Sequence, residues 1–263
     1  MMFVSNFFRS FLCLDHKFVV FHLVLRNLKL KYRRSLFGIV WSLLGPGLSG
    51  FVYYFVFKYV VKMDIENYLV FVLSGVLPWG FVTNSLTSGL ETIVGNHTLF
   101  NKIPLRLNVF NLSENVTHLV NLLVSIPVLF FFSFVTGHSL SINSLYLLPI
   151  LFMLFLLTYS VGFLLGIVFV YFRDLRHIMS IVLQVLFYLT PIVYKTDMIP
   201  EQFKMIVYLN PFGVFFDSIH QVYYYGNALS LNALGIMASW SLFFVLVFHF
   251  VSTGVSRRIV EDL

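Results

Sequence analysis

The sequence predicts an all-α membrane protein with six transmembrane helices, and two observations support this fold class. First, 59% of the 263 residues are hydrophobic and only 11% are charged, whereas soluble domains carry about 25% charged residues. Second, six apolar segments approach the roughly 20 residues that a helix needs to cross a bilayer. The predicted spans form one domain over residues 36–263 and lie at Leu36–Val61, Tyr68–Gly89, Asn115–Thr136, Leu145–Tyr171, Ile178–Tyr194 and Ala228–Ser252.

Basic residues are distributed unevenly between the predicted loops. Most of the 17 Lys and Arg residues precede the first span, follow the last, or lie in the loops after the second and fourth spans. The opposite side holds Lys58, Lys62, Lys195 and Lys204. The positive-inside rule therefore places both termini in the cytoplasm, as an even number of spans also requires. The net charge of +6 is interpreted as a topology signal, so no nucleic-acid partner is expected.

Residues 1–35 precede the first span and contain the amphipathic stretch KFVVFHLVLRNLKLKYRR. Its apolar and basic residues recur at helical spacing on two faces, which is typical of a helix lying in the cytoplasmic membrane interface. Two interpretations stay open: a plain topology anchor, or a surface that attracts a phosphorylated lipid headgroup. The apolar face comprises Phe18, Phe21, Leu25, Leu28 and Tyr32, and the predicted headgroup-attracting residues are Arg26, Lys29, Arg33 and Arg34.

The loop after the second span, residues 90–108, contains a short amphipathic segment between Gly95 and Pro104. A short cytoplasmic helix of this kind can dock into the groove of a partner protein. An ordinary connector would have the same composition, so both interpretations are kept.

The loop after the fourth span reads YFRDLRH, Tyr171–His177. Asp174 can pair there with Arg173 or Arg176, although a surface ion pair contributes little free energy. The loop is either a stop-transfer segment or a second cytoplasmic contact.

Aromatic residues are dense in the first and fifth predicted spans. Tyrosine near a membrane boundary usually belongs to an interfacial aromatic belt. The alternative is a lined conduit, because flat amphipathic rings suit the apolar faces of sugars. The residues predicted to line such a channel are Trp41, Phe51, Tyr53, Tyr54, Phe57, Tyr188 and Tyr194. By contrast, the small residues of the first and fourth spans are interpreted as packing positions, and GFLLG in the fourth span fits the small-xxx-small pattern of close helix packing. These residues are Gly45, Gly47, Gly50, Gly162 and Gly166.

The segment between the fifth and sixth spans, residues 195–227, is apolar but broken by Pro200 and Pro211. Proline disfavours continuing a helix through it. The pattern predicts two short helices that dip back into the membrane from outside.

Several kinds of chemistry lack a motif in this sequence. It contains no phosphate-binding loop, no metal-ligand spacing and no nucleophile elbow. The predicted spans hold almost no charged residues, with Glu114 at the head of the third span as the nearest case, which argues against a proton- or ion-coupled pump. The single Cys13 cannot form an internal disulfide. The chain is therefore not predicted to be an enzyme, and energy for transport would have to come from a partner.

The order of several motifs resembles the membrane subunit of ABC-2-type polysaccharide exporters, the group of the O-antigen, teichoic-acid and capsule exporters. The resemblance covers nearly the whole chain and depends on RNLKLKYRRSLFGIVWSLLGPGL, FVLSGVLPWGFVTNSL, ETIVGNHTLFNKIP, VYFRDLRHIMSIVLQVLFYLTPIVY and IPEQFKMIVYLNPF. It implies a homodimer in the bacterial cytoplasmic (inner) membrane with two copies of a separate ABC ATPase. ATP and Mg would bind that partner, and this chain would hold no cofactor or metal.

The resemblance also implies roles for particular residues. Residues 90–108 would include the helix that contacts the ATPase. Residues 195–227 would form the external gate, with LNPF, Leu209–Phe212, as the turn between its two short helices. One departure is Ile103, where many relatives have an aromatic residue. The implied coupling residues are Glu91, Gly95, Asn96, Phe100, Lys102 and Arg106, and the implied gate residues are Pro200, Phe203, Asn210 and Pro211.

The function predicted from these observations is export of a polysaccharide linked to polyprenyl pyrophosphate across the cytoplasmic membrane, driven by ATP. One alternative is an ABC-2-type subunit that exports a small amphiphile, such as a drug or a lipid. A membrane enzyme of glycan assembly would need an acidic or metal-binding cluster, which the sequence does not offer. A non-catalytic assembly scaffold is the remaining alternative.

Overall fold

The structure is a computed structural model of the chain and describes residues 11–32, 40–96 and 105–255. All regular elements in these ranges are helical, and the described residues contain no strand. The helices are α2 (Lys17–Tyr32), α3 (Val40–Phe55), α4 (Tyr68–Gly95), α6 (Leu107–Val135), α7 (Leu147–Tyr171), α8 (Leu175–Leu189), α9 (Lys204–Leu209), α10 (Gly213–Ile219) and α11 (Leu231–Val255). Two π-helical turns extend α3 and α10, at Val56–Val60 and His220–Tyr224.

Four helices are long and apolar enough to cross a membrane: Tyr68–Gly95, Leu107–Val135, Ile142–Tyr171 and Leu231–Gly254. They confirm four of the six predicted apolar helices. The other two are shorter in the described residues, since α8 has 15 residues and α3 has 16 before its π-helical turn. The all-helical class is confirmed, and the six-span topology stays a prediction.

α6 begins at Leu107, well before the predicted start at Asn115. Asn108, Asn111 and Ser113 in its first turns are buried rather than solvated. Asn111 Nδ2, for example, donates a hydrogen bond to the Tyr159 carbonyl oxygen of α7 at 2.9 Å. Polarity therefore did not mark a helix boundary here.

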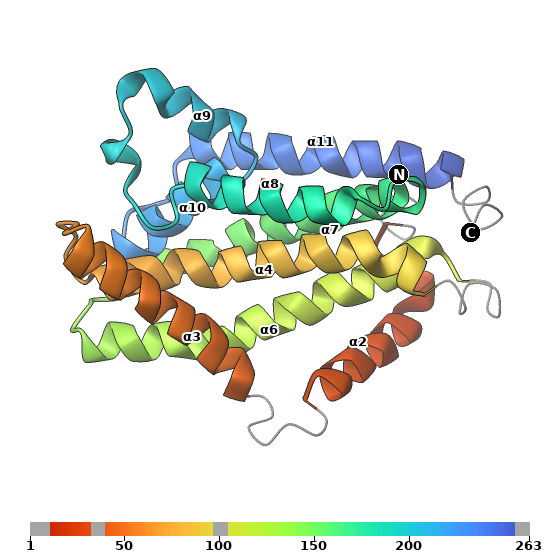
Figure 1. Cartoon of the computed structure of the whole chain (residues 1–263), viewed down its shortest axis with the longest axis horizontal. Helices are drawn as coiled ribbons and strands as arrows, with labels where there is room; N and C mark the ends of the chain where they lie inside the picture. The colour runs from red at the N-terminus through yellow and green to blue at the C-terminus, as the bar shows by residue number, and fades with distance from the viewer. Residues whose placement is uncertain (1–10, 33–39, 97–104, 256–263) are drawn as a thin grey trace.

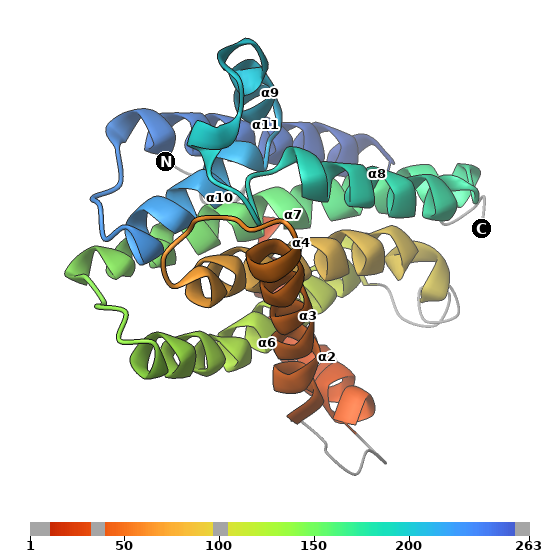
Figure 2. The same cartoon turned by 60° about the vertical axis from the view of Figure 1, so that its left-hand side comes forward.

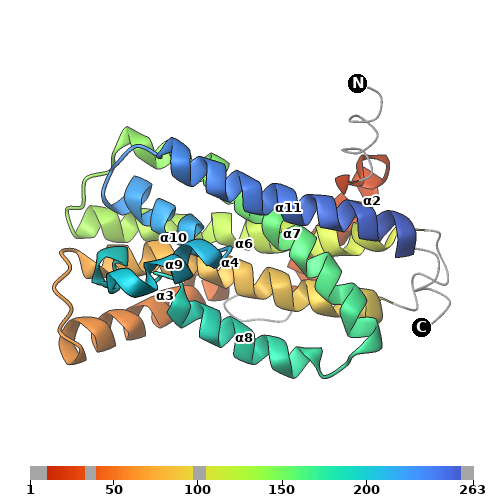
Figure 3. The same ribbon diagram turned by 90° about the horizontal axis from the view of Figure 1, so that it is seen from above.

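The helices run mostly along the long axis of the molecule, and α3 crosses them at an angle (Figure 1). α4 is buried along most of its length and packs against α6, α7, α3 and α8. Seen from above, α11 and α8 lie at opposite edges of the bundle, and α3 lies near the α8 edge (Figure 3). This arrangement places α4 at the centre and α3 and α8 outside it.

The predicted packing glycines of the fourth span are confirmed at the crossing of α4 and α7, whereas a Cβ atom on Gly45 or Gly47 of α3 would meet nothing within 4 Å. A Cβ atom on Gly89 would lie 2.7 Å from the Cα atom of Gly162, and one on Gly166 would lie 2.8 Å from the Gly89 carbonyl oxygen. No larger side chain fits these positions without moving a backbone, which is the usual reason for small residues at membrane-helix crossings.

The predicted amphipathic helix is present as α2, which packs on α6. Val20 and Val24 are buried, while Phe18 and Phe21 are 71% and 58% exposed. The helix therefore divides its apolar residues between the bundle and its outer surface. Its position in the membrane interface stays a prediction.

Candidate functional site

A cleft of about 500 Å³ opens between α3, α4 and α8. Four aromatic residues share its wall: the rings of Tyr53 and Phe187 lie 5.2 Å apart, and those of Phe187 and Trp79 lie 6.0 Å apart. Tyr188 meets Phe187 edge-on at 5.2 Å and is 56% exposed. The polar lining residues are Ser49, Thr83, Ser180 and Gln184.

The helical repeat of α8 explains how the cleft is built. Leu183 and Phe187 are one turn apart and buried, so this stripe of α8 faces inward. Ser180 and Gln184, one turn apart on a neighbouring stripe, line the cleft. None of the described residues that line it is charged. Rings with hydroxyl and amide groups beside them suit a neutral ligand that has both apolar faces and hydroxyl edges, such as a sugar ring.

Of the predicted channel residues, the structure brings Tyr53 and Tyr188 together in the cleft. Four of the others, Phe51, Tyr54, Phe57 and Tyr194, do not line it. Phe51 is exposed, and Tyr54 stacks on Tyr68 with ring centres 6.4 Å apart. Tyr194 donates a hydrogen bond to the Tyr188 carbonyl oxygen at 2.8 Å. Neither Phe57 nor Tyr194 lines the cleft, and the side chain of Trp41 lies outside the described residues.

Sequence reasoning did not assign Trp79 or Phe187 to the site. Trp79 is buried at the middle of α4, and its ring also meets Phe212 at 5.9 Å and Phe216 at 5.6 Å. Phe212 directly precedes α10 and Phe216 belongs to it. Trp79 therefore separates the cleft from the segment after α8. A tryptophan far from both ends of a predicted span was the available signal, since tryptophan is usually enriched at the membrane interfaces.

The segment after α8 forms the two predicted short helices, α9 and α10, and its α9 part projects beyond α11 (Figure 2). The predicted turn lies between them. Asn210 fixes this turn: its Nδ2 donates to Thr190 Oγ1 at 2.8 Å, and its Oδ1 accepts from the Phe212 amide at 3.0 Å. A Cβ atom on Gly213 would lie 2.0 Å from the Val207 carbonyl oxygen, so the turn requires glycine there.

The four predicted gate residues divide into two pairs. Asn210 is buried and Pro211 is half-buried, both within the turn. Pro200 and Phe203 are exposed in the segment that leads into α9. Entry of this hairpin into the membrane stays a prediction.

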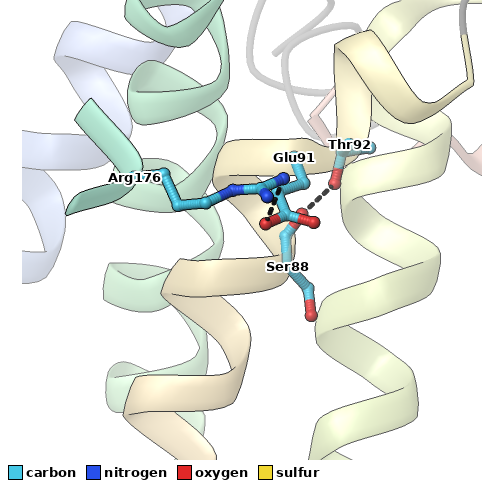
Figure 4. Close-up of polar contacts among 4 residues, drawn as sticks. All are labelled: Ser88, Glu91, Thr92 and Arg176. Carbon is cyan, nitrogen blue, oxygen red and sulfur yellow. Dashed lines mark hydrogen bonds and ion pairs between the residues drawn. The ribbon is translucent and has the colours of Figure 1, made fainter. Parts of the chain in front are cut away.

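At the other end of the bundle, an ion pair joins α4 to α8 (Figure 4). Glu91 Oε1 lies 2.8 Å from Arg176 Nη2, with side chains 43% and 56% exposed. Beside it, Thr92 Oγ1 donates to the Ser88 carbonyl oxygen at 2.7 Å. The sequence suggested Asp174 as a partner for Arg176. The structure pairs Arg176 with Glu91 instead, because the helical α8 turns its side chain toward α4.

The remaining predicted coupling residues lie around the same end. Gly95 ends α4, and Asn96 Nδ2 caps it by donating to the Thr92 carbonyl oxygen at 2.8 Å. Arg106 directly precedes α6. Phe100 and Lys102 lie outside the described residues.

The predicted headgroup residues are only partly described. Arg26 is exposed, and its Nη2 donates to Asn27 Oδ1 at 3.2 Å. Lys29 is exposed on α2, and Arg33 and Arg34 fall outside the described ranges. In the described parts of the chain, no group of three or more His, Cys, Asp or Glu could hold a metal ion.

The comparison with known families identifies the class of protein. Residues 19–224 match the family model described as ABC-2 type transporter. This chain belongs to that family, as the sequence motifs predicted, and its apolar helices fit a multi-pass membrane protein.

Three relatives show which members of the ABC-2 family this chain is similar to. The chain is 34% identical over 187 residues to the O-antigen export system permease protein RfbA of Klebsiella pneumoniae, covering 71% of this chain and 72% of the relative. It is 30% identical over 247 residues to the RfbA permease of Myxococcus xanthus, covering 93% and 94%. The polysialic acid transport protein KpsM of Escherichia coli is 23% identical over 240 residues, covering 89% and 93%.

Proposed function

We propose that this chain is the membrane subunit of an ATP-driven exporter of a lipid-linked polysaccharide. The observation that carries the proposal is the uncharged aromatic cleft between α3, α4 and α8 in a chain of the ABC-2 family. The names of the relatives support a polysaccharide as the cargo, since two are O-antigen export permeases and one transports polysialic acid.

The chain would act as a homodimer of six-span subunits in the cytoplasmic membrane, with two copies of an ABC ATPase that bind ATP and Mg. α8 has only 15 residues, so as the fifth span it would thin the membrane locally or stand nearly upright. α3 continues directly into the π-helical turn at Val56–Val60, and this added length supports its assignment as the first span.

In this proposal, sugar rings pass along Tyr53 and Tyr188, which both contact the buried ring of Phe187, with the buried Trp79 next to it. The wall offers apolar contact and a few hydroxyl and amide groups, and none of the described lining residues carries a charge that would hold the glycan in place. Such contacts stabilise each ring weakly, so a long glycan can move from one position to the next. A dense set of buried polar partners would instead hold one sugar firmly.

The ATPase would act at the end of the bundle that carries Glu91 and Arg176. α4 ends and α6 begins at this end, and the Glu91–Arg176 ion pair connects it to α8, one wall of the cleft. At the opposite end, the α9–α10 hairpin contacts Trp79 through Phe212 and Phe216. The hairpin is therefore suited to act as the exit gate.

The experiment is complementation in cells that lack this gene. The expected result is loss of surface glycan, restored by the wild-type chain only when its partner ATPase is present and able to hydrolyse ATP. Normal surface glycan combined with new drug sensitivity would instead identify a small amphiphile as the cargo. Restoration with a hydrolysis-dead ATPase would identify a scaffold.

A further inference from the structure

A second cavity, of about 170 Å³, lies between α9, α10 and the beginning of α11. These three elements lie together at one end of the molecule (Figure 3). No described residue lines both this cavity and the cleft. We call it the hairpin cavity, and its polar lining residues are Thr196, Tyr208, Asp217, Ser230 and Asn232.

The α9–α10 hairpin separates the two cavities. Phe212 and Phe216 are four residues apart and contact Trp79, which lines the cleft. Val214 and Asp217 are three residues apart and line the hairpin cavity. At about 3.6 residues per turn, these two pairs lie nearly half a turn apart, so α10 presents one face to each cavity.

Asp217 places a carboxylate in the hairpin cavity, and no Lys, Arg or His is among the described residues that line it. Asp217 Oδ1 accepts a hydrogen bond from Thr196 Oγ1 at 2.5 Å, and its carboxylate is also bonded by the Gln221 side chain. An ionised carboxylate has about four lone-pair sites, so two protein donors leave part of its capacity unused. Because a partly buried carboxylate without a cation is costly, packing alone does not account for Asp217.

The hairpin cavity contains the groups that bind the hydroxyls of a sugar. The Asp217 carboxylate can accept short, charge-assisted hydrogen bonds from hydroxyl groups, and the Asn232 amide offers both donors and an acceptor. Tyr208 is 56% exposed, and its ring supplies a flat surface for the apolar face of a sugar. An apolar ligand would leave the carboxylate unpaired, and an anion would be repelled by it.

The size of the cavity limits the ligand to a single sugar unit. Water occupies about 30 Å³ per molecule in the liquid, so about 170 Å³ corresponds to about five or six water molecules. This volume is close to that of one hexose and much smaller than that of an oligosaccharide. A metal ion is a poorer match, because no group of three or more His, Cys, Asp or Glu in the described ranges could hold one.

We propose that the hairpin cavity binds one sugar unit of the exported glycan after the glycan has passed the hairpin, and that Asp217 selects this unit through its hydroxyl groups. This inference rests on the proposed function, which brings a glycan to this end of the bundle. The charged Asp217 holds a sugar more firmly than the uncharged wall of the cleft does. Retention in the hairpin cavity opposes backward movement of the glycan and so favours export.

Binding of short glycan fragments to the purified chain tests the proposal. The probe is the surface glycan of cells that carry this gene, released from its lipid and fractionated to short fragments. The background is the double variant Tyr53→Ala/Tyr188→Ala, which removes two rings from the cleft and leaves the hairpin cavity intact. Saturation-transfer NMR on the chain in nanodiscs gives the dissociation constant, and thermal unfolding shows whether each variant folds.

The fragments should bind the background, and Asp217→Asn should weaken their binding at least about tenfold, since it removes a charged hydrogen-bond acceptor. Its unfolding midpoint should stay close to that of the background, because the amide oxygen can still accept from Thr196. Thr196→Val removes this hydrogen bond but keeps the carboxylate, so its affinity should stay within about threefold. A purely structural role for the Thr196–Asp217 bond would instead make the two variants alike.

Asp197→Asn is the matched control for charge. Asp197 is exposed in the same segment and does not line the hairpin cavity. Removing its charge should change the affinity by about twofold or less, because the interaction of exposed charges is weak.

Equal binding by the background and by Asp217→Asn would overturn the proposal, as would an absence of binding to the background or an equal loss in Asp197→Asn. If Asp217→Asn fails to fold, Asn232→Ala at the exposed beginning of α11 decides the matter, and it should weaken binding at least about threefold. Failure of the proposed function looks different: cells that lack the chain would keep normal surface glycan, whatever the purified chain binds.

Discussion

Glu91 at the end of α4 and Arg176 at the beginning of α8 form an ion pair, with Oε1 and Nη2 2.8 Å apart. Both side chains are about half exposed, and exposed ion pairs stabilise a protein by only about 0–1 kcal/mol. Their contact therefore matters more for the relative position of two helices than for the stability of the fold. It connects the end proposed to meet the ATPase with a wall of the cleft.

Reversing one of these charges should impair export. We expect Glu91→Arg to lower the export rate by about twofold to thirtyfold, since coupling energies of this kind are about 0.5–2 kcal/mol. The double variant Glu91→Arg/Arg176→Glu should recover most of the rate, because it restores opposite charges. The measurement is surface glycan per cell at matched protein level. Equal loss in the single and double variants would show that the pair itself is not required.

Trp79 should be needed for export beyond its contribution to folding. Trp79→Ala removes a buried ring that contacts Phe187, Phe212 and Phe216, and we expect destabilisation of about 3–5 kcal/mol. Trp79→Phe keeps part of the packing, so it should fold while exporting more slowly. Thermal unfolding and surface glycan are measured together.

Trp240→Phe provides the control for Trp79. Trp240 lies on the far helix α11, stacks on Phe244 and does not line the cleft. We expect normal export from this variant. A Trp79→Phe protein that exports at the wild-type rate would remove Trp79 from the proposed mechanism.

Gly213 should tolerate no side chain. A Cβ atom there would lie 2.0 Å from the Val207 carbonyl oxygen, so Gly213→Ala must push α9 away from α10, at a cost of about 1–3 kcal/mol. Gly235→Ala on α11 is the matched control, because its Cβ would have no atom within 4 Å. The midpoint of thermal unfolding should fall for the first variant and hold or rise slightly for the second. Equal midpoints would contradict the tight turn.

Cys13 should react slowly with thiol reagents in the folded protein. Burial raises the pKa of the Cys13 thiol to about 12, and only the thiolate is reactive. At pH 8 the thiolate fraction is therefore very small, and it grows as the pH rises toward 12. Unfolding in SDS should return the pKa to its ordinary value and accelerate maleimide labelling. Rapid labelling of the folded chain at pH 7 would be the opposite result.

Much of the fold follows from composition and helical length. The four long helices are long apolar runs, and the α9–α10 hairpin is marked by Pro200 and Pro211. The early start of α6 was missed because Asn111 looks like a loop residue until its partner on α7 is known. Local pattern identifies a helix, but it does not reveal which buried polar residue another helix will satisfy.

The site was harder to predict because it is made by distant segments. Aromatic richness indicated Tyr53 and Tyr188, but the same signal included Phe51 and Tyr54, which lie outside the cleft. Which rings share a wall depends on the rotation of each helix, and that is fixed by packing against α4. Likewise, Arg176 has a carboxylate neighbour in sequence, Asp174, yet its partner is Glu91 on another helix.

The most direct test of the proposed function is export by purified components. The chain and its partner ATPase are placed in proteoliposomes loaded on the ATPase side with lipid-linked glycan, and the glycan appearing on the other side is measured with and without ATP. The proposed function predicts translocation that depends on ATP. The double variant Tyr53→Ala/Tyr188→Ala should slow it strongly, and Trp240→Phe should leave its rate unchanged. Translocation without the ATPase, or at an equal rate in the cleft variant, would contradict it.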